Sequence, residues 1–132
     1  MVRYVRSFTM NTFATALNCI DGRIQLPVIR QVQELSSAEY VDMITETGID
    51  RLLTDEAFRK TIQQKMDISI EKHGSKFIAV VAHYDCAGNP VDEATHRIQT
   101  KASRDLLQSL YPELTVVGIW VDEEFKTNII GD

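Results

Sequence analysis

The chain has 132 residues, a formal net charge of −5 and a hydrophobic fraction of 44%. This length and composition predict a single globular domain spanning residues 1–132. The acidic balance argues against a nucleic-acid partner and against a polybasic membrane-binding surface. No apolar run approaches the roughly 18 residues that span a bilayer, and the N-terminus lacks the apolar core of a signal peptide. We therefore expect a cytoplasmic protein without a membrane partner.

The first part of the chain predicts two strands with a helix between them. Residues 13–19 (FATALNC) are apolar between polar flanks, which indicates a buried strand. Pro27 suits the first position of a helix, because its missing N–H would have no intrahelical partner there. Apolar residues follow it at helical spacing, and residues 39–45 (EYVDMIT) then roughly alternate in polarity, as a second strand does.

A long helix and a central strand are predicted next. Residues 54–73 carry apolar side chains four positions apart, with polar residues on the other side. Gly74 follows directly and suits a helix C-terminal cap. Residues 77–82 (FIAVVA) are apolar throughout, which is typical of a strand covered on both faces.

A third helix and a last strand complete the pattern. Asn89 supplies an N-cap and Pro90 the first helical position, with Asp92 in the first turn. Residues 114–121 (LTVVGIWV) then form a strong strand pattern. An apolar stripe runs along the helix between them: Ala94, Ile98, Ala102, Leu106 and Leu110.

This order of strands and helices is typical of α/β proteins. We predict a mainly parallel β-sheet of about four strands flanked by helices on both faces, with right-handed crossovers. The tail at residues 123–132 could add an edge strand, across a subunit interface. In such sheets, ligands bind beyond the carboxyl ends of the strands. Two polar motifs follow predicted strands there, CIDGR at 19–23 and HYDC at 83–86.

Two cysteines and one histidine stand at these strand ends. Cys19 follows the first predicted strand, and His83 and Cys86, three residues apart, follow the third. Two sulfurs and one nitrogen suit tetrahedral zinc, and three protein ligands leave a fourth position open, as in catalytic zinc sites. Each residue alone also has a structural explanation, since a buried cysteine often serves as a small hydrophobic residue. Their joint placement favours a metal site.

Asp21 and Arg23 alternate with Cys19 along the first motif. In extended chain, residues two apart point to the same side. The arginine would hold the carboxylate ionised, and the carboxylate would accept a hydrogen bond from zinc-bound water and aid its deprotonation. Taken alone, Asp21 and Gly22 also suit a turn, and Asp21 with Arg23 a local ion pair.

The two motifs together resemble those of the β-class carbonic anhydrases. Residues 19–23 (CIDGR) resemble the C-x-D-x-R motif of that family. Residues 68–88 (ISIEKHGSKFIAVVAHYDCAG) resemble its helix, strand and H-x-x-C motif. The 60-residue separation of Arg23 and His83 is also similar to that in the family, and the resemblance runs from residue 13 to about 121.

The resemblance implies zinc ligands at Cys19, His83 and Cys86, and a catalytic dyad of Asp21 and Arg23. The implied activity is that of a carbonate dehydratase: carbon dioxide is hydrated reversibly to bicarbonate by attack of zinc-bound hydroxide. A second state, in which Asp21 becomes a fourth zinc ligand, is also implied. Members of the family are homodimers or higher homo-oligomers, with sites near the subunit interface.

The chain departs from the family pattern in several places. Residues 45–53 (TETGIDRLL) lack the family's R-N-A-G-N stretch, the N-terminal arm is missing or very short, and Ala82 and Ala87 replace glycines. Three alternatives remain open. They are a non-catalytic zinc-binding or regulatory domain, a hydrolase of carbon disulfide or carbonyl sulfide, and a thiol switch. In the switch, Cys19 and Cys86 would form a reversible disulfide that expels zinc.

The remaining candidate residues have structural explanations. His73 is expected to contact the last carbonyls of its helix. His96 is expected in solvent beside a polar helix face, with a proton shuttle as the alternative. Asp85 is expected to bond backbone N–H groups within its turn, and Trp120 and Phe125 are expected in the core or at a dimer contact.

Overall fold

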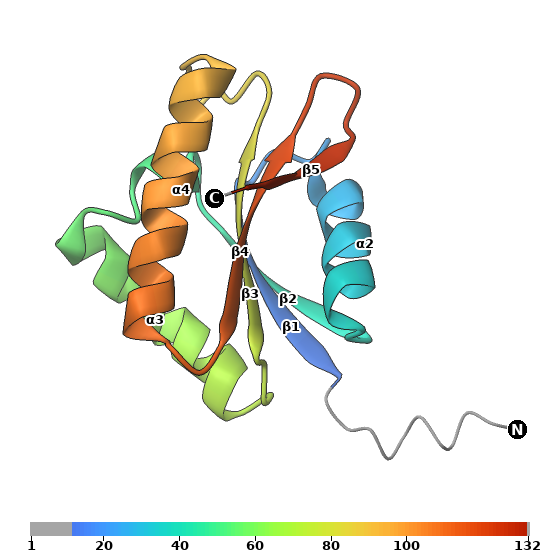
Figure 1. Cartoon of the computed structure of the whole chain (residues 1–132), viewed down its shortest axis with the longest axis vertical. Helices are drawn as coiled ribbons and strands as arrows, with labels where there is room; N and C mark the ends of the chain where they lie inside the picture. The colour runs from blue at the N-terminus through green and yellow to red at the C-terminus, as the bar shows by residue number, and fades with distance from the viewer. Residues whose placement is uncertain (1–11, 132) are drawn as a thin grey trace, which may run out of the picture.

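A five-stranded sheet crosses the middle of the molecule, and the computed structural model describes residues 12–131 (Figure 1). The strands lie in the order β2-β1-β3-β4-β5, of which the first four are parallel and β5 is antiparallel to β4. The elements are β1 (Phe13–Asn18), α2 (Gln25–Ser36), β2 (Tyr40–Thr45), the 3₁₀ helix η1 (Ile49–Arg51), α3 (Glu56–Glu71), β3 (Phe77–His83), α4 (Glu93–Leu110), β4 (Thr115–Val121) and β5 (Thr127–Ile130). The predicted α/β class with a mainly parallel sheet is confirmed, and the tail adds its edge strand within the same chain.

Helices cover both faces of the sheet, α2 on one side and α3 with α4 on the other (Figure 1). Side chains along a strand alternate between the two faces. Ala16 therefore packs in one core with Val32 of α2, whereas Leu17 packs in the other with Met66 of α3 and Leu107 of α4. None of the helices formed by residues 12–131 combines the length and apolar character that crossing a membrane requires.

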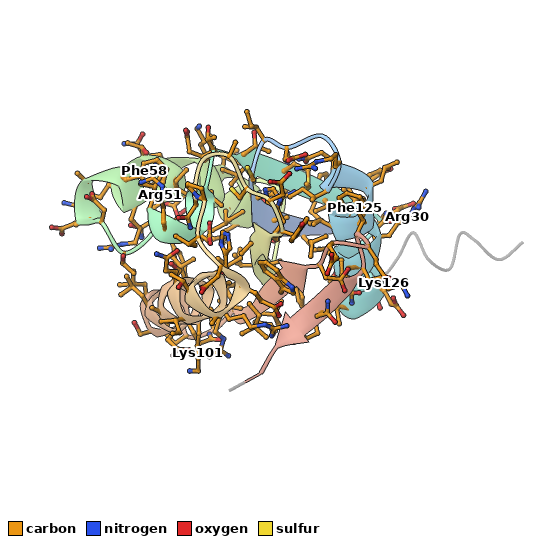
Figure 2. All side chains as sticks on the ribbon, turned by 90° about the horizontal axis from the view of Figure 1, so that it is seen from above. Arg30, Arg51, Phe58, Lys101, Phe125 and Lys126 are labelled. Atoms are coloured by element: carbon orange, nitrogen blue, oxygen red, sulfur yellow. The ribbon has the colours of Figure 1, made fainter. Side chains whose placement is uncertain are left out.

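The register between β1 and β3 decides where the residues that follow them lie. Leu17 pairs with Val80 in parallel alignment. Continuing this register by two residues brings Cys19 beside Ala82, one residue before His83. The two polar motifs of the sequence therefore meet at the carboxyl edge of the sheet, as predicted. Figure 2 is seen from above this edge, with Arg51 on one side of it and Phe125 on the other.

Two helices begin elsewhere than predicted. Helix α2 begins two residues before Pro27, which is still within the first turn, where N–H groups lack intrahelical partners. Helix α4 begins after Asp92, whose carboxylate caps it by accepting a hydrogen bond from the Thr95 N–H at 2.9 Å. Asn89 does not cap α4, because its side-chain amide donates instead to Asp50.

Helix α4 buries a polar face and leaves its predicted apolar stripe near the surface. Ile98 is 71% exposed, whereas His96 is 1% and Thr100 and Ser103 are 0% exposed. The prediction that His96 lies in solvent is therefore wrong. The polar face fits because Gly118 of β4 leaves room for the Thr100 methyl group, and because the Ser103 hydroxyl donates to a backbone carbonyl of η1 at 3.2 Å.

His73 lies after α3, at the amino edge of the sheet, and makes a different contact from the one predicted. Its Nδ1 is 2.7 Å from Asp42 Oδ2, and its ring stacks on Phe13 with 4.1 Å between centroids. The same carboxylate accepts a hydrogen bond from Ser69 Oγ at 2.7 Å. The His73 side chain therefore ties α3 to the strands instead of capping its own helix.

Two loops touch backbone to backbone at the carboxyl edge. Gly48 has a φ of +61°, in the left-handed region that favours glycine. A Cβ atom on Gly88 would lie 2.5 Å from Thr47 Cγ2 and 2.8 Å from the Thr47 carbonyl carbon. Only a residue without a side chain fits at this position, so the loop that carries Cys86 rests directly on the loop that follows β2.

We expect Gly88→Ala to destabilise the protein by about 1–3 kcal/mol, the usual cost of forcing a methyl group into a packed site. Gly22→Ala is the matched control, because a Cβ atom there has nothing within 4 Å, and surface substitutions usually change stability by no more than about 0.5 kcal/mol. Urea unfolding midpoints measure both variants. Equal midpoints for the two variants would show that the loops separate readily.

Candidate metal centre

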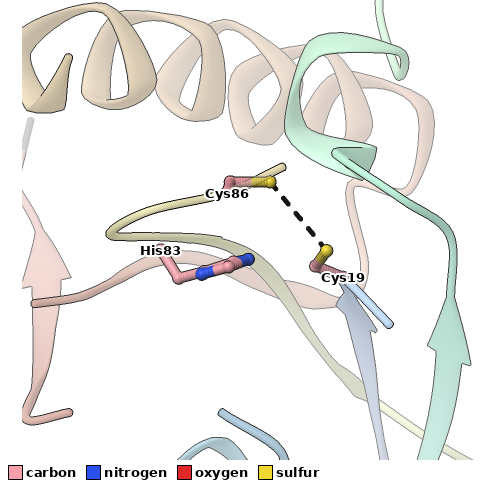
Figure 3. Close-up of side chains that lie close together, drawn as sticks. All are labelled: Cys19, His83 and Cys86. Atoms are coloured by element: carbon pink, nitrogen blue, oxygen red, sulfur yellow. Dashed lines mark hydrogen bonds between the residues drawn. The ribbon is translucent and has the colours of Figure 1, made fainter. Parts of the chain in front are cut away.

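Three side chains converge where β1 and β3 end (Figure 3). Cys19 follows β1 directly, His83 is the last residue of β3, and Cys86 comes three residues later. Their potential ligand atoms all lie within 4.8 Å of one another, and all three residues are buried. The structure therefore brings together the three residues that the sequence predicted as ligands, in an arrangement that can hold a metal ion.

The donor atoms fit a tetrahedral ion. The two sulfur atoms, which belong to free thiols, lie 3.9 Å apart. A tetrahedral zinc ion with bonds of about 2.3 Å would place two sulfurs roughly 3.8 Å apart. His83 Nδ1 donates to the Tyr84 carbonyl oxygen at 2.8 Å, whereas its Nε2 is buried and has no hydrogen-bond partner among residues 12–131. The lone pair of Nε2 is therefore free for a ligand.

Burial opposes charge on these residues. Burial lowers the pKa of His83, against the hydrogen bond to Tyr84, which raises it. Burial and the neighbouring Cys19 thiol raise the pKa of Cys86 to about 11. Without a metal ion, Cys86 is therefore protonated and His83 neutral near pH 7, and an ion that binds here must displace at least the Cys86 proton.

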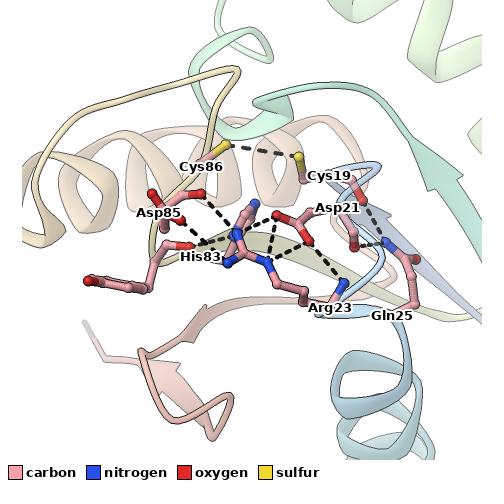
Figure 4. Close-up of polar contacts among 8 residues, drawn as sticks. Cys19, Asp21, Arg23, Gln25, His83, Asp85 and Cys86 are labelled. Atoms are coloured by element: carbon pink, nitrogen blue, oxygen red, sulfur yellow. Dashed lines mark hydrogen bonds and ion pairs between the residues drawn. The ribbon is translucent and has the colours of Figure 1, made fainter.

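Asp21 and Arg23 form a two-pronged ion pair at the rim of this cluster (Figure 4). Arg23 Nη2 lies 2.7 Å from Asp21 Oδ2, and Nε lies 3.1 Å from Oδ1. The backbone N–H of Arg23 also donates to Oδ1, at 2.9 Å. The hydrogen bonds from Arg23 lower the pKa of Asp21 to about 2 and raise that of Arg23. Asp21 is therefore a fixed, ionised carboxylate that faces Arg23.

Two further residues contact the loop that carries Asp21 and Arg23, and the sequence assigned neither of them a role there. Asp85, which has a φ of +58°, places Oδ2 3.4 Å from Arg23 Nη1, and its carbonyl oxygen accepts from Nη2 at 3.2 Å. Asp85 was predicted to bond backbone N–H groups within its turn, whereas its carboxylate contacts the Arg23 side chain. Gln25 Nε2 donates to the carbonyl oxygens of Cys19 and Asp21, at 2.9 and 2.7 Å. No sequence signal distinguishes Gln25 from other polar residues at a helix start.

A cavity of about 470 Å³ opens beside Cys86, on the side of α4. Trp120 lines it and is 3% exposed, as the prediction of a core residue required. Phe125 is not in the core, because it is 38% exposed and its ring centroid lies 5.8 Å from the Arg23 guanidinium. Several carboxylates also line the cavity: Asp85, Asp92, Glu93 and Glu123. The cavity therefore repels anions.

A family model described as "Putative carbonic anhydrase" matches residues 9–131. The chain belongs to this carbonic anhydrase family. A comparison with curated protein sequences found no match. The family match covers both motifs quoted above, and with the solved structures described next it confirms the resemblance to β-class carbonic anhydrases.

Solved carbonic anhydrases share the fold at low sequence identity. The enzyme from Streptococcus mutans has a TM-score of 0.62 at 15% identity, over 92% of this chain and 82% of that one. The one from Glaciozyma antarctica has a TM-score of 0.61 at 15% identity, over 97% and 92%. A tetrameric β-carbonic anhydrase from Sordaria macrospora has a TM-score of 0.64 at 13% identity, over 98% and 86%.

The pKa of Asp21 gives a first test of the candidate site. In the metal-free protein we expect the Asp21 carboxyl carbon to titrate near pH 2 by NMR, and to move toward 3.8 in Arg23→Gln. Because the folded pKa is below the unfolded one, this pair stabilises the fold above about pH 4 and loses its contribution as pH falls toward 2. Arg97→Gln, which breaks a pair on α4, is the control. An Asp21 that titrates near 3.8 in the unaltered protein contradicts the pairing.

Metal binding should depend steeply on pH. Because Cys86 carries a proton at all pH values well below 11, each binding event releases at least that proton. The logarithm of the apparent zinc association constant should therefore rise by at least about one per pH unit between pH 6 and 8. Competition with a chromophoric chelator measures it. A flat profile would mean that Cys86 is not a ligand.

Proposed function

We propose that the protein is a zinc-dependent carbonic anhydrase, which interconverts carbon dioxide and bicarbonate. The observation that carries this proposal is a joint one. Cys19, His83 and Cys86 are gathered in one buried cluster, and the paired Asp21 and Arg23 lie at its rim. Membership of the carbonic anhydrase family supports the choice of reaction.

The two cysteine sulfurs and His83 Nε2 are the proposed ligands. Zinc held by three protein ligands supplies a Lewis acid that lowers the pKa of a water molecule toward neutrality. Tyr84 supports His83, because the Tyr84 carbonyl accepts the Nδ1 proton and thereby fixes the ring with Nε2 facing the two cysteines. Two thiolates also balance the charge of a divalent ion, which allows the cluster to remain buried.

Asp21 orients the reacting water in this proposal. Its carboxylate is ionised at every physiological pH, so it accepts a hydrogen bond from water and directs a water lone pair at the carbon of carbon dioxide. Arg23 fixes the carboxylate through two prongs, and Asp85 fixes Arg23. The reaction joins one water oxygen to carbon and releases one proton to the solvent. Whether Asp21 also reaches the zinc ion in a second, closed state remains a prediction.

We also propose that the chain forms a homodimer or a larger homo-oligomer. Exposed apolar side chains flank the candidate site along the chain: Ile20 next to Cys19 is 59% exposed, Leu26 in the first turn of α2 is 58% exposed, and Tyr84 next to His83 is 47% exposed. Exposed apolar residues that gather on one surface are typical of sites that bind another protein. The solved β-carbonic anhydrases from Sordaria macrospora, which share this fold, are tetrameric.

Asp21→Asn tests the catalytic assignment. We expect the unaltered protein to bind about one zinc ion per chain and to hydrate carbon dioxide in stopped-flow assays at pH 7 and 9. Asp21→Asn should keep its zinc and lose activity by roughly 100-fold, because it loses the charged acceptor but not a ligand. Asp105→Asn, an exposed aspartate paired with Lys101 on α4, is the control and should keep full activity.

The possible outcomes separate the alternatives. Zinc without carbon dioxide hydration, but with hydrolysis of carbonyl sulfide or carbon disulfide, would replace the substrate and keep the site. Zinc with none of these activities would make the domain a non-catalytic zinc-binding module. Metal release on mild oxidation, with a Cys19–Cys86 disulfide, would indicate a thiol switch. A chain that binds no zinc would overturn the ligand assignment itself.

A further inference from the structure

A buried polar cluster lies behind the Cys86 loop and takes no part in the proposed reaction. Asp50 of η1 is 2% exposed and His96 of α4 is 1% exposed, and His96 Nδ1 lies 2.6 Å from Asp50 Oδ2. Taking such groups out of water is costly unless each is hydrogen-bonded. The other residues that contact Asp50 and His96 therefore indicate which part of the structure the pair stabilises.

Asn89 connects the pair to the loop that carries Cys86. The side-chain amide of Asn89 donates to Asp50 Oδ2 at 3.2 Å and to Gln99 Oε1 at 2.7 Å, and the residue is 3% exposed. Its backbone N–H lies 3.3 Å from the Cys86 carbonyl oxygen. Asn89 is therefore fixed at its side chain by Asp50 and at its backbone by the turn after Cys86.

Arg51 holds the same turn through the neighbouring carbonyl group. The Asn89 N–H, which donates to the Cys86 carbonyl oxygen, shares its peptide group with the Gly88 carbonyl. Arg51 Nε donates to the Gly88 carbonyl oxygen at 2.9 Å. Because the C=O and N–H of a trans peptide point in opposite directions, that contact turns the Asn89 N–H toward Cys86.

We infer that Asp50 and His96 are positioning residues for the metal centre. His96 fixes the Asp50 carboxylate, Asp50 fixes the Asn89 side chain, and the Asn89 N–H closes the turn that carries Cys86. The closed turn holds the Cys86 sulfur opposite Cys19 and His83. This inference rests on the proposed zinc site, and it assigns a role to two residues outside the ligand set and outside the Asp21–Arg23 pair.

The geometry of His96 allows a matched pair of variants. Its Nε2 is buried and has no hydrogen-bond partner among residues 12–131, so the contact passes through Nδ1 alone. Asparagine places an amide N–H near the Nδ1 position, whereas glutamine places it near Nε2. His96→Asn therefore keeps the donor to Asp50 and leaves the larger void, and His96→Gln loses the donor and fills more space. Packing alone would make His96→Asn the worse variant.

Cobalt(II) and zinc are the probe ions for the experiment. We expect His96→Gln and Asn89→Ala to weaken binding of both ions at least 10-fold, and to shift the thiolate-to-cobalt charge-transfer band. The metal affinity of His96→Asn should stay within about threefold of that of the unaltered protein, and its charge-transfer band should not shift. His73→Gln, which breaks the other histidine–aspartate pair at the amino edge of the sheet, is the control. It should leave the metal affinity and the charge-transfer band unchanged.

Three results would overturn the inference. The first is a folded His96→Gln that binds both ions as tightly as the unaltered protein. The second, decisive if His96→Gln does not fold, is an Asn89→Ala variant with unchanged metal affinity and an unchanged charge-transfer band. The third is weaker metal binding by His96→Asn than by His96→Gln, which would reduce the pair to a packing role.

A readout without metal separates this inference from the proposed function. In the metal-free protein, the amide proton shift of Asn89 reports its hydrogen bond to the Cys86 carbonyl oxygen, and we expect this shift to change in His96→Gln but not in His96→Asn. If the unaltered protein binds no ion but the shift changes as expected, the proposed function fails and the positioning of the loop stands. An unchanged shift in both variants refutes the positioning.

Discussion

The parallel pairing of β1 with β3 is the constraint on which the candidate site depends. Cys19 and His83 are distant in sequence, and they meet only because Leu17 is aligned with Val80. A slip of one residue would turn every β1 side chain to the opposite face, so Ala16 and Leu17 would each lie in the core that is packed around the other. Burial of apolar residues on both faces therefore fixes the position of the proposed ligands.

The site has a buried side, formed by Cys86 and His83, and a partly exposed side, where Asp21 lies, and the pKa shifts on the two sides have different causes. Burial raises the pKa of Cys86 and lowers that of His83, so the buried side disfavours charge of either sign. Asp21 is partly exposed, and its pKa falls because Arg23 binds it. A bound divalent cation would favour the charged forms only on the buried side, because it supplies the positive charge that stabilises buried thiolates. Asp21 keeps its charge with or without the ion.

Much of this arrangement was predictable from the sequence, because apolar periodicity reports burial directly. Apolar runs placed four strands, and strand ends placed the candidate ligands at Cys19, His83 and Cys86, which the structure brings together. The polar contacts between residues far apart in the chain were not predictable. The buried His96 pairs with Asp50, 46 positions away in the chain, and Asp85 pairs with Arg23 across 62 positions. A hydrogen bond between distant residues leaves no local pattern.

One segment that departs from the family pattern, residues 45–53, supports the Cys86 loop in three ways. Gly48 lies against Gly88, Arg51 binds the Gly88 carbonyl, and Asp50 binds Asn89. The contacts converge on two adjacent residues, which limits how that loop can move.

The same segment accounts for the orientation of α4. Turning Ile98 inward would gain roughly 1.5–3 kcal/mol of apolar burial. The rotation would also withdraw His96 from Asp50 and Ser103 from its carbonyl acceptor in η1, and each buried polar group that loses its partner costs about 1–3 kcal/mol, more where the group is charged. The larger cost decides the orientation. Helix α4 therefore presents its polar face to η1 and leaves an isoleucine in water.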